Sequence, residues 1–351
     1  MSEKIGICLI GAGRAGMIHG RNFASRIPHA KMTAVVDFQE EQARRAAQEL
    51  TCPWFTDYRE GLRQPGVDAV VIAVPTIYHH DIAVEAARMG KHILCEKPLA
   101  MNVEECRNMI READENGVKL QVGFMRRFDE GFLRAKELID QGTIGDVVTV
   151  RSLTRGPSTP QEWMYDIEKS NGPLAEVNSH DIDMLRWFTC SEVKSLYAMA
   201  GNYRCPQIKE QYPDFYDSVL LSLRMENNMM GNIDGAQGVR YGYDARVDIL
   251  GTRGCITVGD LKSGSAVSYT RENGMCSDVV SSWKDLFRDA YIHEDSSFAE
   301  CIRKDTKPVV TGYDGLMALA VVKAGNQSIR TGNIVTMNEV LENTGRTGQQ
   351  V

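Results

Sequence analysis

Three glycines near the amino terminus have the spacing of a turn that holds a phosphate group. Gly11, Gly13 and Gly16 follow a short apolar run and precede a segment compatible with a helix. In such a turn the first glycine permits the bend, the second lets the backbone approach a pyrophosphate, and the third allows close packing of helix on strand. The helix then offers N–H groups and the positive end of its dipole to the diphosphate. The pattern predicts a dinucleotide site that also includes Arg14 and Ala15.

The identity of the dinucleotide depends on Asp37, which ends a second apolar segment at residues 31–37. A carboxylate at this point accepts hydrogen bonds from both ribose hydroxyls of the adenosine and repels a 2′-phosphate. The next residues, Phe38, Gln39 and Glu40, include no arginine or lysine that could bind such a phosphate. We therefore expect NAD rather than NADP. Capping of the following helix by Asp37 is compatible with this role.

Two further places hold side chains that could exchange a proton with a substrate. Lys97 follows the apolar strand expected at 91–95, at the carboxyl edge where ligands of parallel sheets bind. Glu176 and His180 are four residues apart and would share one face of a continuous helix. Imidazole is suited to acid–base catalysis near neutral pH. Taken singly, a solvated lysine and a buried histidine are the commoner explanations. A metal site that uses these two residues and Asp183 is disfavoured, since no other ligand cluster accompanies them.

The elements that must position these residues alternate between strands and helices in the first third of the chain. Strands are expected at 31–37, 54–55, 67–75, 91–95 and 119–123, and helical segments up to 50 and at 58–62, 78–90 and 103–117. This alternation of apolar strands and helices predicts an α/β fold, with a doubly wound, parallel Rossmann sheet over residues 1–124.

From about residue 125 the pattern changes to strands with polar alternation and turns rich in Gly, Asn and Asp. Helices are expected at 130–141 and about 313–330, and strands at 145–152, 193–200, 218–225, 230–237, 245–250 and 255–258. We expect residues 125–351 to form an α+β domain with a large, open and mostly antiparallel sheet. The helix at 313–330 could pack back on the Rossmann domain.

The composition narrows the class of protein. Of the 351 residues 43% are apolar and 25% charged, and the net charge is −7 with a pI near 5.6. This balance argues against nucleic-acid or anionic-membrane partners, and no apolar run reaches membrane-spanning length. The nine cysteines form no C-x-x-C pair and the amino terminus has no signal-peptide layout, so we expect reduced thiols in the cytoplasm.

Further motifs carry a resemblance to a known family. They are Glu96-Lys97-Pro98, the segments 75–79, 123–129 and 172–183, and the late helix from Asp314 to Gly332. With the glycine turn, they resemble the glucose–fructose oxidoreductase, inositol dehydrogenase and MocA family (Gfo/Idh/MocA) in order and spacing over nearly the whole chain. Segment 123–129 is most similar to that of the inositol 2-dehydrogenases.

The resemblance implies an active site between a Rossmann domain and a second domain whose sheet forms a dimer or tetramer. It places Lys97 and His180 in proton handling, with Glu176 beside them, and it extends the cofactor contacts to the following residues: Pro75, Thr76, His79, Glu96 and Lys97. Two positions depart from the family. Glu176 replaces the usual aspartate, and Asn171 replaces the first of two glycines often found there.

The substrate implied by the resemblance is a small polyhydroxylated ring, which needs several polar groups and a flat surface for binding. The candidates, in falling order, are Arg127, Arg155, Trp163, Tyr165, Asp166 and Tyr291. An ordinary surface loop is an equal alternative for residues 155–163, and Tyr291 would also fit a core position.

We therefore expect NAD-dependent oxidation of a secondary ring hydroxyl of a cyclitol, sugar or glycoside to a ketone, as in an inositol 2-dehydrogenase. Within the family, a sugar or glycoside 3-dehydrogenase and a keto-sugar reductase remain alternatives. From another class, a non-catalytic NAD-dependent regulator is the rival, although a pure sensor need not keep both Lys97 and His180.

Overall fold

The computed structural model describes residues 4–342, and their contacts divide the chain into two units. Unit 1 comprises the residues up to 128 together with 289–316, and unit 2 comprises 129–288 and the residues from 317 on. The first boundary lies near the expected one, but 289–316 was expected in the second domain. The reason is packing, because Phe298 and Ala299 of this segment belong to the same buried cluster as Ile7 and Leu9.

Unit 1 contains a six-stranded sheet in which every neighbouring pair is parallel, in the order β3-β2-β1-β4-β5-β6. The strands are β1 (Ile5–Ile10), β2 (Ala30–Val36), β3 (Trp54–Phe55), β4 (Ala69–Ile72), β5 (His92–Cys95) and β6 (Leu120–Val122). Strands β1 and β4 are buried along their whole length, as expected for a sheet covered on both faces. This order is that of a doubly wound nucleotide-binding sheet, so the predicted fold class is confirmed.

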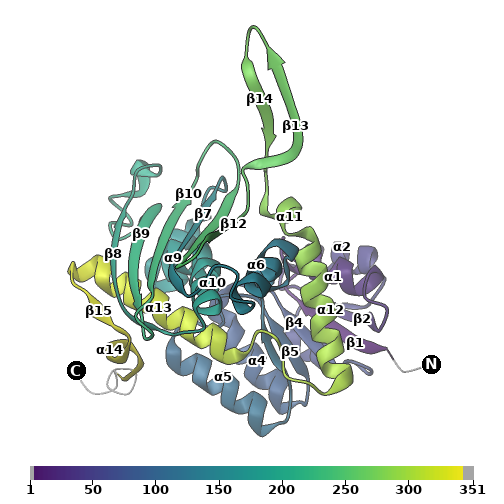
Figure 1. The fold of residues 1–351 in the computed structure, drawn as a ribbon. Coiled ribbons are helices and arrows are strands. Elements are labelled where there is room, and N and C mark those ends of the chain that lie inside the picture. The colour runs from purple at the N-terminus through teal and green to yellow at the C-terminus, as the bar shows by residue number, and fades with distance from the viewer. Residues whose placement is uncertain (1–3, 343–351) are drawn as a thin grey trace. The chain divides into compact units, whose positions relative to one another are not determined.

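Helices connect these strands and bury one apolar side each. They are α1 (Gly16–Ser25), α2 (Glu40–Leu50), α3 (Tyr58–Leu62), η1 (Thr76–Tyr78), α4 (His79–Arg88), α5 (Val103–Glu115), η2 (Met125–Phe128) and α12 (Arg288–Lys304). Although α12 comes from a distant part of the chain, it lies beside α1 (Figure 1). The contact is polar as well as apolar, since Asn22 Nδ2 donates to Asp295 Oδ2 at 2.8 Å.

Unit 2 contains a seven-stranded sheet in the order β12-β11-β7-β10-β9-β8-β15. Its strands are β7 (Val147–Gly156), β8 (Val193–Gly201), β9 (Ser218–Met225), β10 (Met230–Gln237), β11 (Asp244–Gly251), β12 (Cys255–Val258) and β15 (Val335–Thr336). Every pair is antiparallel except β10 with β7, which is parallel. The expected mostly antiparallel sheet is confirmed.

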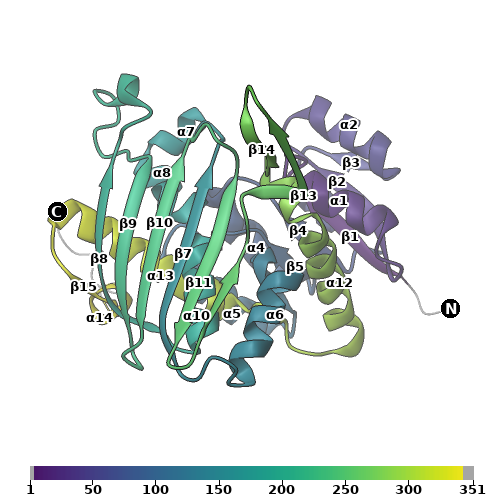
Figure 2. The ribbon, with the colours of Figure 1, turned by 45° about the horizontal axis from the view of Figure 1, so that its top comes forward.

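Helices of unit 2 pack on one face of this sheet (Figure 2). The helices of the unit are α6 (Glu130–Asp140), α7 (Glu162–Tyr165), α8 (Ile167–Ser170), α9 (Gly172–Glu176), α10 (Ser179–Thr189), η3 (Pro206–Ile208), α11 (Trp283–Leu286), α13 (Gly312–Thr331) and α14 (Met337–Glu342); α13 begins in unit 1. Close approach to β10 depends on glycine, because a Cβ atom at Gly231 would lie 2.4 Å from Leu185 Cδ2.

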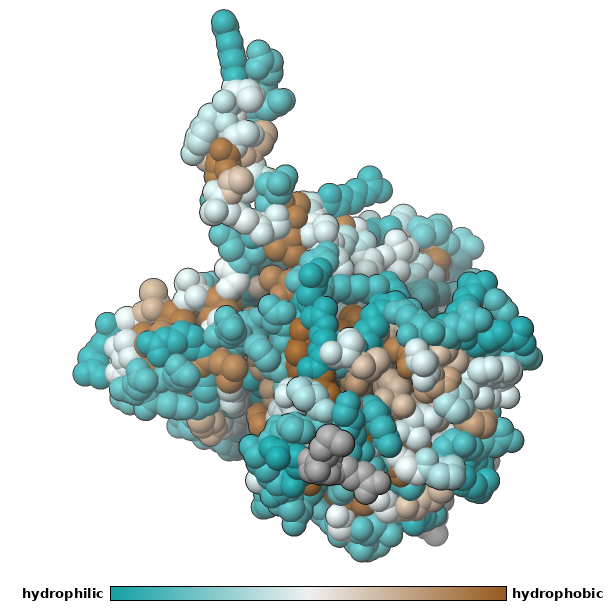
Figure 3. Space-filling model, turned by 90° about the vertical axis from the view of Figure 1, so that its right-hand side faces the viewer, coloured by the Kyte–Doolittle hydropathy of each residue, from teal (hydrophilic) through white to brown (hydrophobic). Residues whose placement is uncertain are grey.

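The sequence did not lead us to expect one element, a separate two-stranded ribbon formed by β13 (Lys262–Thr270) and β14 (Gly274–Val279). Nearly all of its residues are exposed, including Tyr269 and Met275. Figure 3 shows mostly hydrophilic residues on the ribbon with a few apolar ones among them. An alternating apolar face, which is the usual signal of a strand, is therefore missing from these segments.

Candidate active site

The glycine turn between β1 and α1 has the predicted geometry at all three positions. Gly11 has φ of +97°, and a Cβ atom there would lie 2.5 Å from the carbonyl oxygen of Ala73. At Gly16 a Cβ atom would lie 1.9 Å from the carbonyl oxygen of Gly11. Gly13 differs, since a Cβ atom there would meet no atom within 4 Å. The outer two glycines are thus required by the protein's own packing, whereas Gly13 leaves space open above the start of α1.

Asp37 lies next to this turn and is 6% exposed. Its Oδ2 accepts hydrogen bonds from Ala12 N at 2.9 Å and Gln42 Nε2 at 3.0 Å, and its Oδ1 accepts one from Gln39 N at 3.0 Å. A carboxylate has about four acceptor positions, so with these three hydrogen bonds about one position remains for a ribose hydroxyl. The open space at Gly13, the start of α1 with exposed Arg14 and half-buried Ala15, and the fixed carboxylate together fit a dinucleotide.

The segments after β4 and β5 are tied together by His79, which is buried. Its Nδ1 lies 2.9 Å from Pro98 O and its Nε2 lies 2.8 Å from Val74 O. Burial lowers the pKa of His79. These contacts make His79 a link between the segment that contains Pro75 and the buried Thr76 and the segment around Lys97. Its predicted contact with the cofactor stays a prediction.

Glu96 and Lys97 follow β5 at the carboxyl edge of the sheet, as predicted. Lys97 is half-buried, and the Lys97–Pro98 peptide bond is cis. Glu96 is 7% exposed, and its Oε2 accepts a hydrogen bond from the backbone N–H of Lys97 at 3.1 Å. Burial would raise the pKa of Glu96, but the hydrogen bond and charge of His19 and the charge of Lys97 lower it.

His19 is a residue of this region that sequence reasoning missed. It lies on α1 three residues after Gly16, and it is fully buried between Glu96 and Asp295. A histidine one turn into the helix that follows the glycine turn was the available signal. Its meaning depended on Asp295, which is 276 residues away in the chain.

In unit 2, Glu176 and His180 belong to consecutive helices rather than to one. Helix α9 ends at Glu176 and α10 begins at Ser179, so the expectation of a shared face on a continuous helix is not met. The break lies at Val177 and Asn178, where Asn178 N reaches back to Pro173 O at 3.3 Å. His180 is 6% exposed and Glu176 is half-buried. Their catalytic roles stay predictions.

The start of α10 is fixed to the sheet by Asp181, which is fully buried. Its Oδ1 accepts hydrogen bonds from Ser152 Oγ at 2.5 Å and Thr154 Oγ1 at 2.9 Å, both on β7. Its Oδ2 accepts one from Asn178 Nδ2 at 2.8 Å. Hydrogen bonds to a carboxylate are among the stronger ones in proteins. The neighbouring residue His180 is therefore placed by a rigid backbone.

Asn171, which departs from the family pattern, occupies a left-handed backbone position with φ of 58°, and Gly172 follows with φ of 72°. Asparagine tolerates this region better than other non-glycine residues. The carbonyl oxygen of Asn171 accepts a hydrogen bond from Asn326 Nδ2 at 2.9 Å. A Cβ atom at Gly172 would lie 2.7 Å from Ile167 Cδ1. The second position thus requires glycine, whereas the first does not.

Two of the predicted substrate residues belong to unit 1 and are buried. Arg127 Nη2 donates to Asp314 Oδ1 at 2.8 Å in a pair whose side chains are 8% and 15% exposed. Tyr291 places its ring edge against the ring of His19, with 5.3 Å between the centroids. Tyr291 thus occupies the core position that was the alternative to substrate binding.

Three more predicted residues lie in the short helices after β7. Trp163 Nε1 donates to Gln161 Oε1 at 2.8 Å, and the Tyr165 ring packs edge-on against Phe215 at 5.0 Å. Asp166 caps α8 by accepting a hydrogen bond from Glu168 N at 3.1 Å. These contacts stabilise the segment itself, and its role in substrate binding stays a prediction.

Arg155 lies on the sheet face opposite to the one that holds Asp181. Buried Ser152 and Thr154 face the helices, and Arg155 follows them on the outer side, where it forms a two-pronged ion pair with Asp234 of β10. The hydrogen bond to Asp234 raises the pKa of Arg155. This location does not support a contact with substrate near His180, so we leave Arg155 out of the proposal below.

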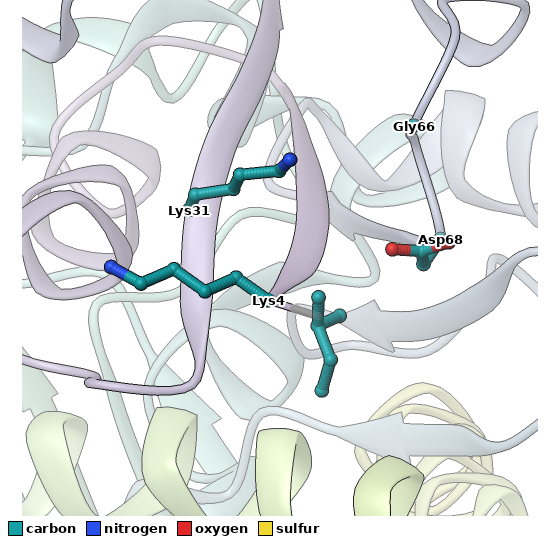
Figure 4. A pocket seen from close by; sticks show the side chains of 5 residues that line it. Lys4, Lys31, Gly66 and Asp68 are labelled. Atoms are coloured by element: carbon teal, nitrogen blue, oxygen red, sulfur yellow. The ribbon is translucent and has the colours of Figure 1, made fainter. Parts of the chain in front are cut away.

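A surface pocket of about 250 Å³ lies at the opposite edge of the unit 1 sheet. Lys4, Ile5, Lys31, Gly66 and Asp68 line it, at or before the amino-terminal ends of their strands (Figure 4). Ligands of open α/β sheets bind at the carboxyl ends of the strands. The glycine turn, rather than this pocket, is therefore the candidate ligand site of unit 1.

Neither a metal centre nor a membrane span is found within residues 4–342. No group of three or more His, Cys, Asp and Glu side chains in this range is placed to hold a metal ion. None of the helices described here combines the length and hydropathy that a membrane crossing requires.

The fold and the glycine turn define the class: an α/β protein with a dinucleotide-binding Rossmann unit and a second unit built on an antiparallel sheet. Residues 5–124 match the family model described as an oxidoreductase family with an NAD-binding Rossmann fold, and residues 132–257 match the GFO/IDH/MocA C-terminal domain. The chain belongs to the Gfo/Idh/MocA oxidoreductase family, as its motifs suggested, and its cofactor is NAD.

Relatives match nearly the whole chain. A scyllo-inositol 2-dehydrogenase (NAD(+)) of Bacillus subtilis is 33% identical over 98% of this chain and 100% of its own length. A myo-inositol 2-dehydrogenase of Thermotoga maritima is 31% identical over 96% of this chain and 99% of its own. The crystal structure of scyllo-inositol dehydrogenase from Lactobacillus casei with bound NAD(H) and scyllo-inositol has a TM-score of 0.87, 25% identity, and coverage of 95% and 99% of the two chains.

Proposed function

We propose that this protein is an NAD-dependent dehydrogenase that oxidises a secondary ring hydroxyl of a cyclitol to a ketone. The observation that carries the proposal is the similarity to two inositol 2-dehydrogenases over almost the full length of all the chains. The glycine turn and Asp37 support it independently, since their geometry fits a dinucleotide.

The chemistry divides between the cofactor and the chain's own residues. Bound NAD⁺ supplies the acceptor for the hydride that leaves the carbinol carbon. Lys97 and His180 handle the proton that leaves the hydroxyl oxygen: the ammonium orients the oxygen, and the imidazole takes the proton and passes it to solvent. Glu176 orients the imidazole or binds a neighbouring hydroxyl. Helix α10 is anchored through Asp181, which favours a fixed position for this histidine.

The test is NADH formation with NAD⁺ or NADP⁺ across myo-inositol, scyllo-inositol, free sugars and glycosides. We expect turnover of an inositol with NAD⁺. Turnover of glycosides alone would replace the cyclitol by a sugar-ring substrate and make Glu176 a specificity residue. No turnover, with NAD⁺ binding intact, would contradict the proposal and favour a regulator.

Variants test the residue roles. Lys97→Ala and His180→Ala should each lower kcat by about 10²–10⁴-fold, the usual contribution of a positioned acid or base. Lys91→Ala is the matched control for Lys97→Ala, because Lys91 lies at the opposite end of β5. Its ammonium donates a hydrogen bond to Val67 O at 2.6 Å. Wild-type rates in both folded site variants would refute the assigned roles.

We also propose a homo-oligomer that forms through the outer face of the seven-stranded sheet. Exposed apolar side chains gather there: Tyr197 and Met199 on β8, Leu220 on β9, Met230 on β10 and Leu250 on β11. Strand register puts them on one face, since Met199 pairs with Leu220. Light scattering should give a dimer or tetramer, and Leu220→Arg should lower the mass. An unchanged mass would refute this interface.

A cytoplasmic location is part of the proposal. All nine cysteines are free thiols, among them fully buried Cys8 and Cys95. Reduced thiols are usual in reducing compartments. Cell fractionation checks the location, and recovery outside the cytoplasm would contradict it.

A further inference from the structure

A fully buried histidine joins three separate parts of unit 1. His19 Nδ1 lies 2.6 Å from Asp295 Oδ1, and His19 Nε2 lies 3.2 Å from Glu96 Oε1. Asp295 Oδ2 also accepts a hydrogen bond from Asn22 Nδ2 at 2.8 Å. The side chains of His19 and Asp295 are 0% exposed. Both ring nitrogens thus face carboxylate oxygens, an arrangement that suits an imidazolium with two N–H donors.

The three parts are the phosphate-binding helix, the lysine segment and a helix from late in the chain. His19 and Asn22 belong to α1, which follows the glycine turn, and Asp295 belongs to α12. Glu96 extends the chain of contacts, because its Oε2 accepts the backbone N–H of Lys97 at 3.1 Å. A continuous path of hydrogen bonds therefore runs from α12 through α1 to the backbone at Lys97.

Packing leaves Glu96 little freedom to leave this path. A Cβ atom at Gly123, just after β6, would lie 3.1 Å from Glu96 Oε2 and 3.2 Å from its Cα. On the other side, the ring of Tyr291 meets the ring of His19 edge-on at 5.3 Å. Glu96 thus lies in a slot closed by strand β6 and by the histidine.

The charges around His19 favour its protonated form. Burial alone would lower the pKa of His19, but Asp295 and Glu96 raise it well above its usual value. Burial raises the pKa of Asp295 despite the opposing effect of His19. Glu294 is also fully buried, and burial raises its pKa well above the usual range. The charge of Lys97 also acts on this cluster, since it lowers the pKa of Glu96.

We propose that His19 is a positioning residue: held by Asp295, it fixes Glu96 and, through Glu96, the backbone that carries Lys97. The inference rests on the proposed function, since the consequence for rate assumes that Lys97 acts on the substrate. In this proposal α12 helps to position Lys97, because its residue Asp295 holds the imidazole of His19 in the orientation that Glu96 requires.

Two substitutions separate the two contacts of the imidazole. The amide of His19→Gln can donate from near the place of Nε2 and keeps the contact with Glu96. The amide of His19→Asn can donate from near the place of Nδ1 and keeps only the contact with Asp295. Arg21→Ala, on the same helix, is the control because it removes an exposed pair with Glu49 whose side chains are 55% and 47% exposed.

We expect His19→Asn to lower kcat at least about tenfold, or about 1.4 kcal/mol in barrier height, with a smaller change in the KM for the polyol. His19→Gln keeps the contact with Glu96 but loses the one with Asp295, so it should lose less activity than His19→Asn, and Arg21→Ala should match the wild type. Equal losses in the Asn and Gln variants, or no loss in either, would overturn the proposal.

A readout that does not depend on activity separates this proposal from the proposed function. The rate of acetic anhydride labelling at Lys97 in the free protein, followed by mass spectrometry, should change in His19→Asn and not in His19→Gln. If the wild type oxidises no polyol, the proposed function fails, and the labelling still decides the role of His19. Unchanged labelling in His19→Asn would refute it.

A further variant covers the case in which His19→Asn does not fold. Asp295→Asn keeps the shape of the partner and removes its charge. The pH at which His19 releases its proton, followed by its imidazole NMR signals, should then fall relative to the wild type. An unchanged titration would refute the role of Asp295.

Discussion

Alanine at Gly13 and at Gly16 should have opposite effects, because the two glycines face different surroundings. A Cβ atom at Gly13 would meet no protein atom within 4 Å, and its φ lies outside the left-handed region. Gly13→Ala should therefore leave the fold intact, or stabilise it by about 0.4–1 kcal/mol through the lower entropy of the unfolded chain. A Cβ atom at Gly16 would lie 1.9 Å from a backbone oxygen, so Gly16→Ala should destabilise by about 1–3 kcal/mol or more.

Among the variants that fold, Gly13→Ala should bind the cofactor more weakly than Gly16→Ala, although it is the more stable of the two. The methyl group of Gly13→Ala occupies the space through which a pyrophosphate approaches the start of α1. Loss of one hydrogen bond to a charged group costs about 1.5–3 kcal/mol, which corresponds to a Kd for NADH roughly 10–150-fold weaker. The assays are urea denaturation for stability and NADH fluorescence titration for affinity.

Gly264→Ala is the matched control for Gly13→Ala. A Cβ atom there also meets nothing within 4 Å, but Gly264 lies in the exposed ribbon of β13 and β14. Like Gly13→Ala, it should leave the fold intact or stabilise it slightly, but it should not change the affinity for NADH. Wild-type NADH affinity in Gly13→Ala would refute the argument that the open space at this glycine is where the diphosphate lies.

Three further predictions concern cofactor choice, a buried ion pair and pH. Asp37→Ala should raise the KM for NAD⁺ and reduce the enzyme's preference for NAD⁺ over NADP⁺, because the carboxylate that repels a 2′-phosphate is removed. An unchanged ratio of the KM for NADP⁺ to the KM for NAD⁺ would contradict this. Asp314→Ala should destabilise by about 3–5 kcal/mol in urea denaturation, because it breaks the buried pair with Arg127, whereas Glu40→Ala, which removes an exposed pair, should cost no more than about 0.5 kcal/mol. Since its neighbours raise the pKa of His19 above the usual 6.5, its stabilising contribution is complete below that pH and is lost as pH rises through the folded-state pKa. The stability difference between wild type and His19→Asn should therefore shrink as the pH rises above 6.5 in urea titrations, and a difference that grows with pH would refute the assignment.

Much of the fold could be predicted because its signals are local. Strands at 218–225, 230–237 and 255–258 have the predicted bounds, since apolar and polar residues alternate along them. The ribbon of β13 and β14 could not be predicted in this way, because both of its faces meet solvent. The short helices α7 and α8 also lacked a signal, since a single turn is too short for a period to show.

In the candidate site, too, features set by local sequence could be predicted, whereas features set by long-range contacts could not. The close packing at Gly11 and Gly16 depends on their own backbone and near neighbours, so the sequence predicted it, whereas the contact of Gly13 with a diphosphate stays a prediction. The break between Glu176 and His180 depends on Asn178, whose side chain binds Asp181 and packs on β10, and spacing alone does not reveal that contact. Long-range partners of this kind lie beyond any periodic pattern.

The return of residues 289–316 to unit 1 has a consequence for how the chain folds during synthesis. The first 128 residues leave the ribosome with all six strands of the Rossmann sheet, but without α12. At that stage Asp295 has not been made, so His19 lacks one of its hydrogen-bond acceptors. Phe298 is also missing, so the buried cluster around Ile7 and Leu9 is incomplete. All of residues 129–288 must follow before the missing helix emerges. We therefore expect the nascent nucleotide-binding unit to be sensitive to proteases and dependent on chaperones until α12 has emerged.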